Sequence, residues 1–251
     1  MKPTYNSYES GGRTIHYAEI GHDSLPLVIL VHGAPGGWSG YLNFFKDTAL
    51  LSKVKIVAVD RPGYGKSGYG KSETSIKKQA DMLLPLLEKN ASGKHAVIVG
   101  RSFGGPVVAR MAMDYPGLIG GVVMVAPAVD PSTEQFVWCS ILGKLAFINW
   151  MLPTYMKVAT DEKYTHRQEL RDMMPLWQNI CSPVTIIQGM SDKVVNPSNA
   201  RFAEKMLTNA TRECIFVDDA PHSICSYRPD LVRDAILKHV NWQTPNEAVV
   251  N

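Results

Sequence analysis

The stretch HAVIVGRSFGG, residues 95–105, decides how the rest of this chain is interpreted. Residues 96–99 are continuously apolar, which is typical of a strand buried on both faces of a sheet. Residues 100–104 match the pattern G-x-S-x-G, in which a serine stands at a sharp turn between a strand and a helix. Residues 106–115 then read as a helix that Pro116 and Gly117 end. Ser102 is therefore either a nucleophile whose hydroxyl projects from the sheet or a serine in an ordinary tight turn.

Similar apolar runs recur along the chain, with helical patterns between them. The expected strands cover residues 13–20, 26–31, 55–60, 96–99, 122–125, 184–187 and 214–217. The expected helices cover residues 38–51, 75–89, 106–115, 199–207 and 229–240. Alternation of strands with helices indicates βαβ units and a mostly parallel sheet. The first strand alternates polar and apolar residues, so we expect it to be antiparallel at one edge.

One segment departs from this alternation. Residues 131–181 contain no run typical of a buried strand and are rich in Trp, Met, Phe and Leu. Helical spacing of apolar residues predicts one helix over about 136–148, with Ser132 and Gln135 as a capping box. A second helix is expected over residues 163–174. We interpret residues 131–181 as a helical cap inserted into a core formed by residues 1–130 and 182–251.

Composition bounds the kind of protein. A length of 251 residues with 45% apolar residues fits one large α/β domain. The net charge of +3 is small and its Lys and Arg residues are scattered, so we expect neither nucleic acid nor a membrane surface as a partner. No apolar leader or membrane-spanning run is visible, which favours a soluble cytoplasmic protein. The 4 cysteines have no metal-binding spacing and are expected to be reduced thiols: Cys139, Cys181, Cys214 and Cys225.

Polar residues follow several of the expected strands, at the edge where an open α/β sheet places its ligands. Ala34 follows the 26–31 strand in a Gly-rich loop, and its N–H is a candidate oxyanion donor together with that of Phe103. A plain Gly-Pro turn is the alternative.

Asp192 follows the 184–187 strand, as a triad acid or as a turn cap. His222 alone among the 7 histidines follows a late strand in the loop expected for a general base. His32 is expected to be a structural hydrogen-bonder in the oxyanion loop.

The order Ser102, Asp192, His222 is that of α/β-hydrolase triads. From about residue 13 to 240 the chain resembles α/β-hydrolase-fold serine hydrolases with a short helical cap. The resemblance rests on residues 32–36, 60–67, 100–105 and 189–192 and on Pro221-His222. It implies a mostly parallel sheet of about eight strands with helices on both faces and a cap insertion. It also implies hydrolysis through an acyl-enzyme without metal or organic cofactor, on a small-molecule substrate.

The resemblance leaves the substrate open. A carboxylesterase acting on small or medium apolar esters is our first expectation. Prolyl aminopeptidases, thioesterases and C–C bond hydrolases of the same fold are alternatives, although the aminopeptidases usually carry His-Gly-Gly-Pro-Gly where this chain has Ala34. Epoxide hydrolases and dehalogenases of the family use an Asp nucleophile, which disfavours them. A non-catalytic ligand-binding protein of this fold is a further alternative.

Three further features of the sequence each allow more than one interpretation. Asp130, after the 122–125 strand, is an alternative triad acid and a candidate partner for Arg101. Residues 65–72 match the phosphate-binding pattern G-x-x-x-x-G-K-[ST], but no helix is expected directly after it, so we interpret it as an ordinary loop. Apolar cap residues line an acyl pocket or belong to an ordinary core: Trp138, Phe147, Trp150, Met151 and Met156.

Overall fold

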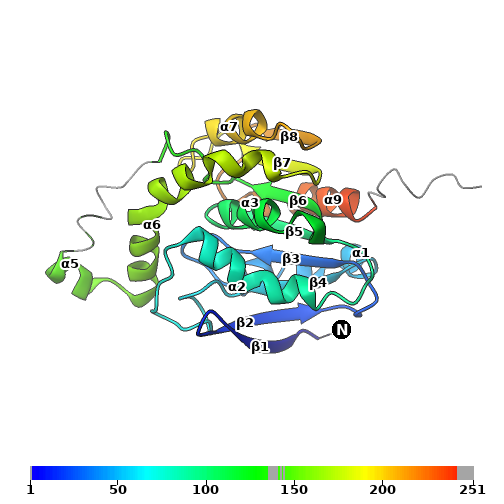
Figure 1. Ribbon diagram of the computed structural model, residues 1–251, viewed down its shortest axis with the longest axis horizontal. Helices are drawn as coiled ribbons and strands as arrows, with labels where there is room; N and C mark the ends of the chain where they lie inside the picture. The colour runs from blue at the N-terminus through cyan, green and yellow to red at the C-terminus, as the bar shows by residue number, and fades with distance from the viewer. Residues whose placement is uncertain (1, 135–140, 142, 144, 242–251) are drawn as a thin grey trace, which may run out of the picture.

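The central sheet of the computed structural model has the order β1-β2-β4-β3-β5-β6-β7-β8 (Figure 1). Residues 2–134, 141, 143 and 145–241 are described. β1 and β2 are antiparallel to each other, β2 is antiparallel to β4, and the remaining neighbours are parallel. The strands are β1 (Thr4–Ser10), β2 (Arg13–Ile20), β3 (Leu27–Val31), β4 (Lys55–Val59), β5 (Ala96–Arg101), β6 (Ile119–Val125), β7 (Val184–Gly189) and β8 (Arg212–Val217).

Helices cover both faces of this sheet. One apolar core packs α2 (Ile76–Glu88), α3 (Gly104–Asp114) and α7 (Ser198–Met206) against it. The core on the opposite face includes α1 (Thr48–Leu51), α8 (Ile224–Tyr227) and α9 (Pro229–Val240). The short 3-10 helices are η1 (Trp38–Tyr41), η2 (Phe44–Lys46), η3 (Pro116–Leu118) and η4 (Met174–Asn179). Because both faces are covered, all five residues of β3 are buried, as its unbroken apolar sequence predicts.

The expected strands are all present, and β1 is an additional one. β2 is antiparallel as expected but is not at the edge, because β1 forms the outer edge of the sheet. From Tyr5 to Ser10 the residues of β1 are alternately exposed and half-buried. The helix expected over residues 38–51 is wrong: the segment divides into η1, η2 and α1. Asp47 explains the last break, because its backbone is extended and its carboxylate accepts the N–H of Leu50 at 3.0 Å, which caps a new helix.

The segment between β6 and β7 contains α5 (Ala146–Met151), α6 (Thr154–Met173) and η4. Both α helices lie on the side toward which the arrows of the parallel strands point (Figure 1). α6 begins at Thr154 rather than at 163, directly after Pro153, because proline is compatible with a helix start but not with its interior. Most of the helix expected over 136–148 lies outside the described residues, and the division into core and cap stays a prediction. Within the described ranges no helix has the length and apolar character needed to cross a bilayer.

Candidate active site

Ser102 occupies a strained turn between β5 and α3. Its φ angle is +53°, in the left-handed region that a side chain rarely adopts. The turn is tied to the sheet because Ser102 N–H donates to the carbonyl of Val125 at 2.9 Å. Neighbouring glycines are required by close approach: a Cβ on Gly100 would lie 2.2 Å from the carbonyl oxygen of Gly104, and one on Gly104 would lie 2.2 Å from that of Val31. Ser102 thus has the backbone geometry of a nucleophile elbow.

Asp192 and His222 are brought together from the loops that follow β7 and β8. Nδ1 of His222 lies 2.7 Å from Oδ2 of Asp192. The other carboxylate oxygen, Oδ1, accepts the backbone N–H groups of Val194 at 2.8 Å and Val195 at 2.9 Å. The Asp192 side chain is fully buried, whereas 16% of the His222 side chain is exposed. The pair therefore has one anchored end and one end within reach of solvent.

The charge state of Asp192 determines the tautomer of His222. Burial acts to raise the pKa of Asp192, but the hydrogen bonds from His222 and from the backbone N–H groups outweigh it, so the pKa is lowered. The carboxyl group is consequently ionised at neutral pH and can only accept hydrogen bonds. Nδ1 of a neutral His222 must then carry the proton, which leaves the lone pair of Nε2 free to act as a base.

The loop after β3 lies directly against Ser102. A Cβ on Gly33 would stand 2.9 Å from Cβ of Ser102 and 3.4 Å from its Oγ. Two backbone N–H groups beside this contact, those of Ala34 and Phe103, donate no hydrogen bond within the described part of the chain. Unpaired N–H groups next to a serine hydroxyl are suited to bind a negatively charged oxygen. The expected oxyanion donors are thus both available.

His32 shapes this loop, as expected. Its Nδ1 lies 2.6 Å from the carbonyl oxygen of Gly33, and its Nε2 accepts the backbone N–H of Arg61 at 2.9 Å. Burial, together with the nearby Arg61 charge, holds the pKa of His32 well below its usual range, so the ring is neutral. His32 is 3% exposed, which leaves it no access to a substrate.

The expected pairing of Arg101 with Asp130 is wrong, since these two residues form no ion pair. Asp130 instead accepts the N–H of Ser132 at 2.8 Å and its hydroxyl at 2.6 Å. Arg101 exerts its charge on buried Tyr41 and Cys225, in the core on the α8–α9 face. Its Nε is buried and has no hydrogen-bond partner among the residues described. Asp130 also makes no hydrogen bond to His222, and we find Asp192 in that position.

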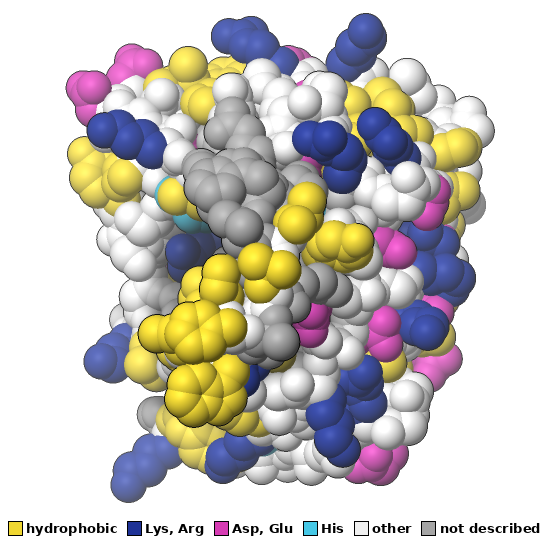
Figure 2. Space-filling model, turned by 90° about the vertical axis from the view of Figure 1, so that its left-hand side faces the viewer, with side chains coloured by type: hydrophobic (Ala, Val, Ile, Leu, Met, Phe, Trp, Pro, Cys, Tyr) yellow, Lys and Arg dark blue, Asp and Glu magenta, His cyan; other side chains and the backbone are white. Residues whose placement is uncertain are grey.

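The apolar residues expected to line a cap pocket are exposed or half-buried where they are described. Phe147, Trp150 and Met151 of α5 are 72%, 77% and 65% exposed, and Met156 of α6 is half-buried. Figure 2 faces this end of the molecule, where apolar side chains form a band. Trp138 lies outside the described residues. The acyl pocket proposed from these residues stays a prediction.

A second His–Asp pair, His16 with Asp60, lies beside a hollow of about 680 Å³ next to Trp38. It is a poor candidate for catalysis because Nε2 of His16 is buried. Asp60 also accepts the backbone N–H groups of Trp38 and Lys66, so its carboxylate anchors the loop after β4. This loop contains the phosphate-binding pattern, yet α2 begins only at Ile76, so the pattern does not open a helix.

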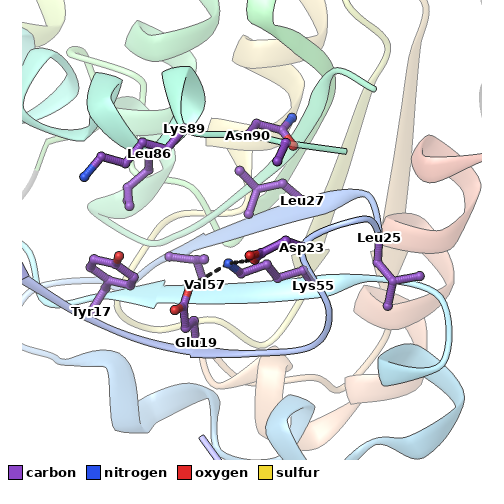
Figure 3. Close-up of a pocket in the computed structure, with 11 residues that line it drawn as sticks. Tyr17, Glu19, Asp23, Leu25, Leu27, Lys55, Val57, Leu86, Lys89 and Asn90 are labelled. Atoms are coloured by element: carbon purple, nitrogen blue, oxygen red, sulfur yellow. Dashed lines mark hydrogen bonds and ion pairs between the residues drawn. The ribbon is translucent and has the colours of Figure 1, made fainter. Parts of the chain in front are cut away.

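A smaller hollow of about 50 Å³ lies at the other end of the parallel strands (Figure 3). Leu27 and Lys55, the first residues of β3 and β4, contribute to it. The ammonium group of Lys55 pairs there with Glu19 at 2.8 Å and Asp23 at 2.5 Å. Since it lies opposite the strand ends that carry Ser102, this hollow is separate from the candidate active site. In the described part of the chain, no cluster of His, Cys, Asp and Glu is arranged to hold a metal ion.

A buried ion pair between Arg61 and Glu162 could not be predicted from the sequence. Both side chains are completely buried, and Nη1 of Arg61 lies 2.5 Å from Oε1 of Glu162. Arg61 follows β4, whereas Glu162 belongs to α6, 101 residues further along the chain. Only the placement of Arg61 directly after a buried strand could have drawn attention to it, and the partner could not be read from the sequence.

Comparison with known proteins agrees with this architecture. A family model described as alpha/beta hydrolase fold matches residues 26–138. The chain is 26% identical over 172 residues to the dihydrolipoyllysine-residue acetyltransferase component of the acetoin cleaving system of Pseudomonas putida, covering 68% of this chain and 46% of that protein. It is 30% identical over 114 residues to a 2-hydroxy-6-oxononadienedioate/2-hydroxy-6-oxononatrienedioate hydrolase of a Pseudomonas species, covering 45% and 40%. The chain thus spans less than half the length of these two relatives.

A solved structure gives the same result over more of the chain. The monoacylglycerol lipase of Paleococcus ferrophilus superposes with a TM-score of 0.72 at 20% sequence identity. The superposition covers 90% of this chain and 98% of that chain. At this identity the likeness establishes the fold.

Proposed function

Because this chain is an α/β-hydrolase-fold protein, we propose that it is a serine hydrolase that works through an acyl-enzyme. Ser102 is the nucleophile, His222 the general base and Asp192 the acid that orients it. The observation that carries the proposal is the 2.7 Å hydrogen bond between His222 and Asp192. It comes from the ends of β7 and β8, at the same edge of the sheet as the strained turn of Ser102.

In the proposed reaction, Nε2 of His222 takes the proton of Ser102 as its oxygen attacks a carbonyl carbon. Asp192 stabilises the imidazolium that forms. The N–H groups of Ala34 and Phe103 bind the oxyanion, where the loss of one donor typically costs about 10²–10³ in rate. His222 then returns the proton to the leaving group and activates a water molecule that hydrolyses the acyl-enzyme.

Small or medium apolar esters are the proposed substrates. A hollow of about 370 Å³ beside Pro35, which follows Ala34, supports this choice. Three tyrosines, Tyr64, Tyr69 and Tyr155, line it together with Pro35 and two glycines. Such walls favour uncharged, apolar groups. The likeness to a hydrolase of 2-hydroxy-6-oxononadienedioate supports C–C bond cleavage as the second candidate.

A fluorophosphonate probe tests the nucleophile directly. We expect it to label wild-type protein at Ser102, and to label neither Ser102→Ala nor His222→Ala. Ser39→Ala, which alters an exposed serine of η1, is the matched control and should label normally. Undiminished labelling of Ser102→Ala would contradict the proposal, and a wild-type protein that neither labels nor hydrolyses any ester would favour a non-catalytic ligand-binding protein.

A chromogenic panel then tests the substrate class. It contains esters of increasing acyl length, thioesters, prolyl amides and a 2-hydroxy-6-oxo-dienoate, with Ser102→Ala as the blank. We expect the highest kcat/KM for a short apolar ester. A strong preference for the dienoate would replace the esterase proposal by the C–C bond hydrolase, while preference for a charged acyl group would contradict the apolar site.

A further inference from the structure

The cap helix α6 is joined to the core by a buried ion pair that lies close to the oxyanion loop. Glu162 meets Arg61 through both carboxylate oxygens, at 2.5 Å from Nη1 and 3.2 Å from Nη2. Tyr64 donates to Oε2 of Glu162 at 2.6 Å, and Gln79 donates to Oε1 at 3.0 Å. The Glu162 carboxylate is thus fully hydrogen-bonded in a site that excludes water, which fixes its position closely.

Nη1 of Arg61 also donates to Oε1 of Gln79 at 2.8 Å, and two further donors of Arg61 are used on the loop after β3. Its Nη2 donates to the carbonyl of Gly33 at 3.0 Å, and its Nε donates to the carbonyl of His32 at 2.8 Å. His32 reinforces the first of these contacts. Because its Nε2 accepts the N–H of Arg61, its proton is on Nδ1, which donates to the same Gly33 carbonyl.

These contacts orient the peptide group that carries the Ala34 N–H. The bond between Gly33 and Ala34 is trans, so its C=O and N–H point in opposite directions. Arg61 and His32 hold the carbonyl on their side, and the N–H is consequently directed away from them. Gly33 itself packs against Ser102. The direction of the Ala34 N–H is therefore set by Arg61 together with His32.

The second donor rests on the same guanidinium group. The Arg61 Cζ atom lies 4.6 Å from the ring centroid of Phe103, the residue whose N–H is the other proposed donor. The imidazole of His166, also on α6, stacks on that ring at 4.6 Å. Displacement of Arg61 would thus disturb both Ala34 and Phe103.

We propose that Glu162 is a positioning residue through which the cap helix sets the geometry of the oxyanion hole, an inference that rests on the serine-hydrolase function proposed above. Glu162 supplies the charge that holds Arg61 in place, and Arg61 orients the donors at Ala34 and Phe103. Without that charge the guanidinium has no ionic partner in a buried site, and it must move or admit water.

Glu162→Gln tests this role because it retains the size of the side chain and removes the charge. We expect kcat to fall about tenfold or more, since misdirecting a donor forfeits part of the 10²–10³ that it contributes. KM should stay within about twofold, because the donors act on the transition state. The affinity of a trifluoromethyl ketone, which forms a tetrahedral adduct with the serine, should weaken by the same factor as kcat/KM.

Glu169→Gln is the matched control on the same helix. Glu169 accepts the backbone N–H of Ile76 at 2.8 Å, so it also helps α6 to dock, but it has no hydrogen bond to Arg61. A purely structural role of the cap would make the two variants alike in kcat and ketone affinity. Such a result, or an unaltered kcat in a folded Glu162→Gln protein, would overturn the inference.

Tyr64→Phe replaces Glu162→Gln if the latter fails to fold. It removes one hydrogen bond from Glu162 and leaves the ion pair intact, so a smaller fall in kcat with unaltered KM is expected; no fall would overturn the inference. An inactive wild-type protein would overturn both proposals, whereas an active wild-type protein with an unaltered variant overturns only this one.

Discussion

Asp192 holds His222 with one carboxylate oxygen and its own loop with the other. Oδ2 lies 2.7 Å from Nδ1 of His222, while Oδ1 accepts two backbone N–H groups of residues 194 and 195. The carboxylate therefore cannot rotate without losing hydrogen bonds at both ends. This double anchorage keeps the imidazole in one tautomer and one orientation, which is what the proposed general base requires.

Asp192→Asn should reduce kcat by about 10³–10⁴ on a p-nitrophenyl ester, with little effect on the fold. The amide nitrogen of Asn can place a donor opposite Nδ1, which favours the tautomer in which Nε2 carries the proton and cannot act as a base. Asp130→Asn is the control, since Asp130 accepts hydrogen bonds from Ser132 and makes none with His222. If the Asp130 variant lost activity and the Asp192 variant kept it, the acid would have been assigned to the wrong residue.

Gly33→Ala should abolish esterase activity while the protein remains folded. The added Cβ would stand 2.9 Å from Cβ of Ser102, closer than such atoms approach, and 3.4 Å from the hydroxyl oxygen. The serine or the loop must shift, and a misplacement of about 1 Å can cost 10²-fold in rate. Gly40→Ala provides the control, because nothing lies within 4 Å of its Cβ. Circular dichroism and kcat/KM on one ester decide the comparison, and equal activity of the two variants would count against the proposed site.

Ser102→Gly should stabilise the protein while it removes the nucleophile. The φ angle of +53° costs a non-glycine residue about 1–2 kcal/mol, part of which the flexibility of glycine in the unfolded chain offsets. We expect the free energy of unfolding in urea to rise by on the order of 1 kcal/mol. Ser102→Ala removes the same hydroxyl but keeps the strained backbone, so it should show no comparable gain. Equal stability of the two variants would mean that the turn is not strained.

The parallel core of the fold was predictable because burial on both faces imposes a simple pattern. β3 is LVILV, with every residue buried, and such a run identifies a central strand without knowledge of its neighbours. β1 could not be predicted in this way, because an edge strand needs no apolar residues. The segment 38–51 was misjudged because its apolar residues fit a helix, whereas Asp47 starts a new one.

The candidate site divides in the same way. Ser102, Asp192 and His222 could be named because each follows a strand end, and strand ends meet at one edge of a parallel sheet. The Arg61–Glu162 pair spans 101 residues and depends on how α6 docks, which no local pattern encodes. The pairing of Arg101 with Asp130 failed for the same reason: Arg101 lies by the core of the α8–α9 face, and Asp130 bonds a neighbour in its own loop.

Acid should destabilise the protein through His239, which is buried in α9. Burial, with the nearby charge of Lys238, lowers the pKa of His239 to about 4 from about 6.5, and Glu213 opposes this only in part. The folded state thus binds fewer protons than the unfolded state between these two values. The stabilisation is complete above pH 6.5 and is lost as the pH falls toward 4, on the order of 2 kcal/mol by pH 5.

The free energy of unfolding in urea at pH 7 and pH 5 measures this loss. His239→Gln should lower the difference between the two pH values, because glutamine can accept the hydrogen bond of Thr185, 3.0 Å from Nε2 of His239, without titrating. Because only the difference between the two pH values is compared, an effect of the substitution on the free energy of unfolding at pH 7 does not alter the test. His22→Gln, at an exposed position, should leave the pH difference at the wild-type value. A pH difference unaltered in His239→Gln would show that acid acts elsewhere, with buried His166, whose pKa is lowered to about 3, as the next residue to substitute.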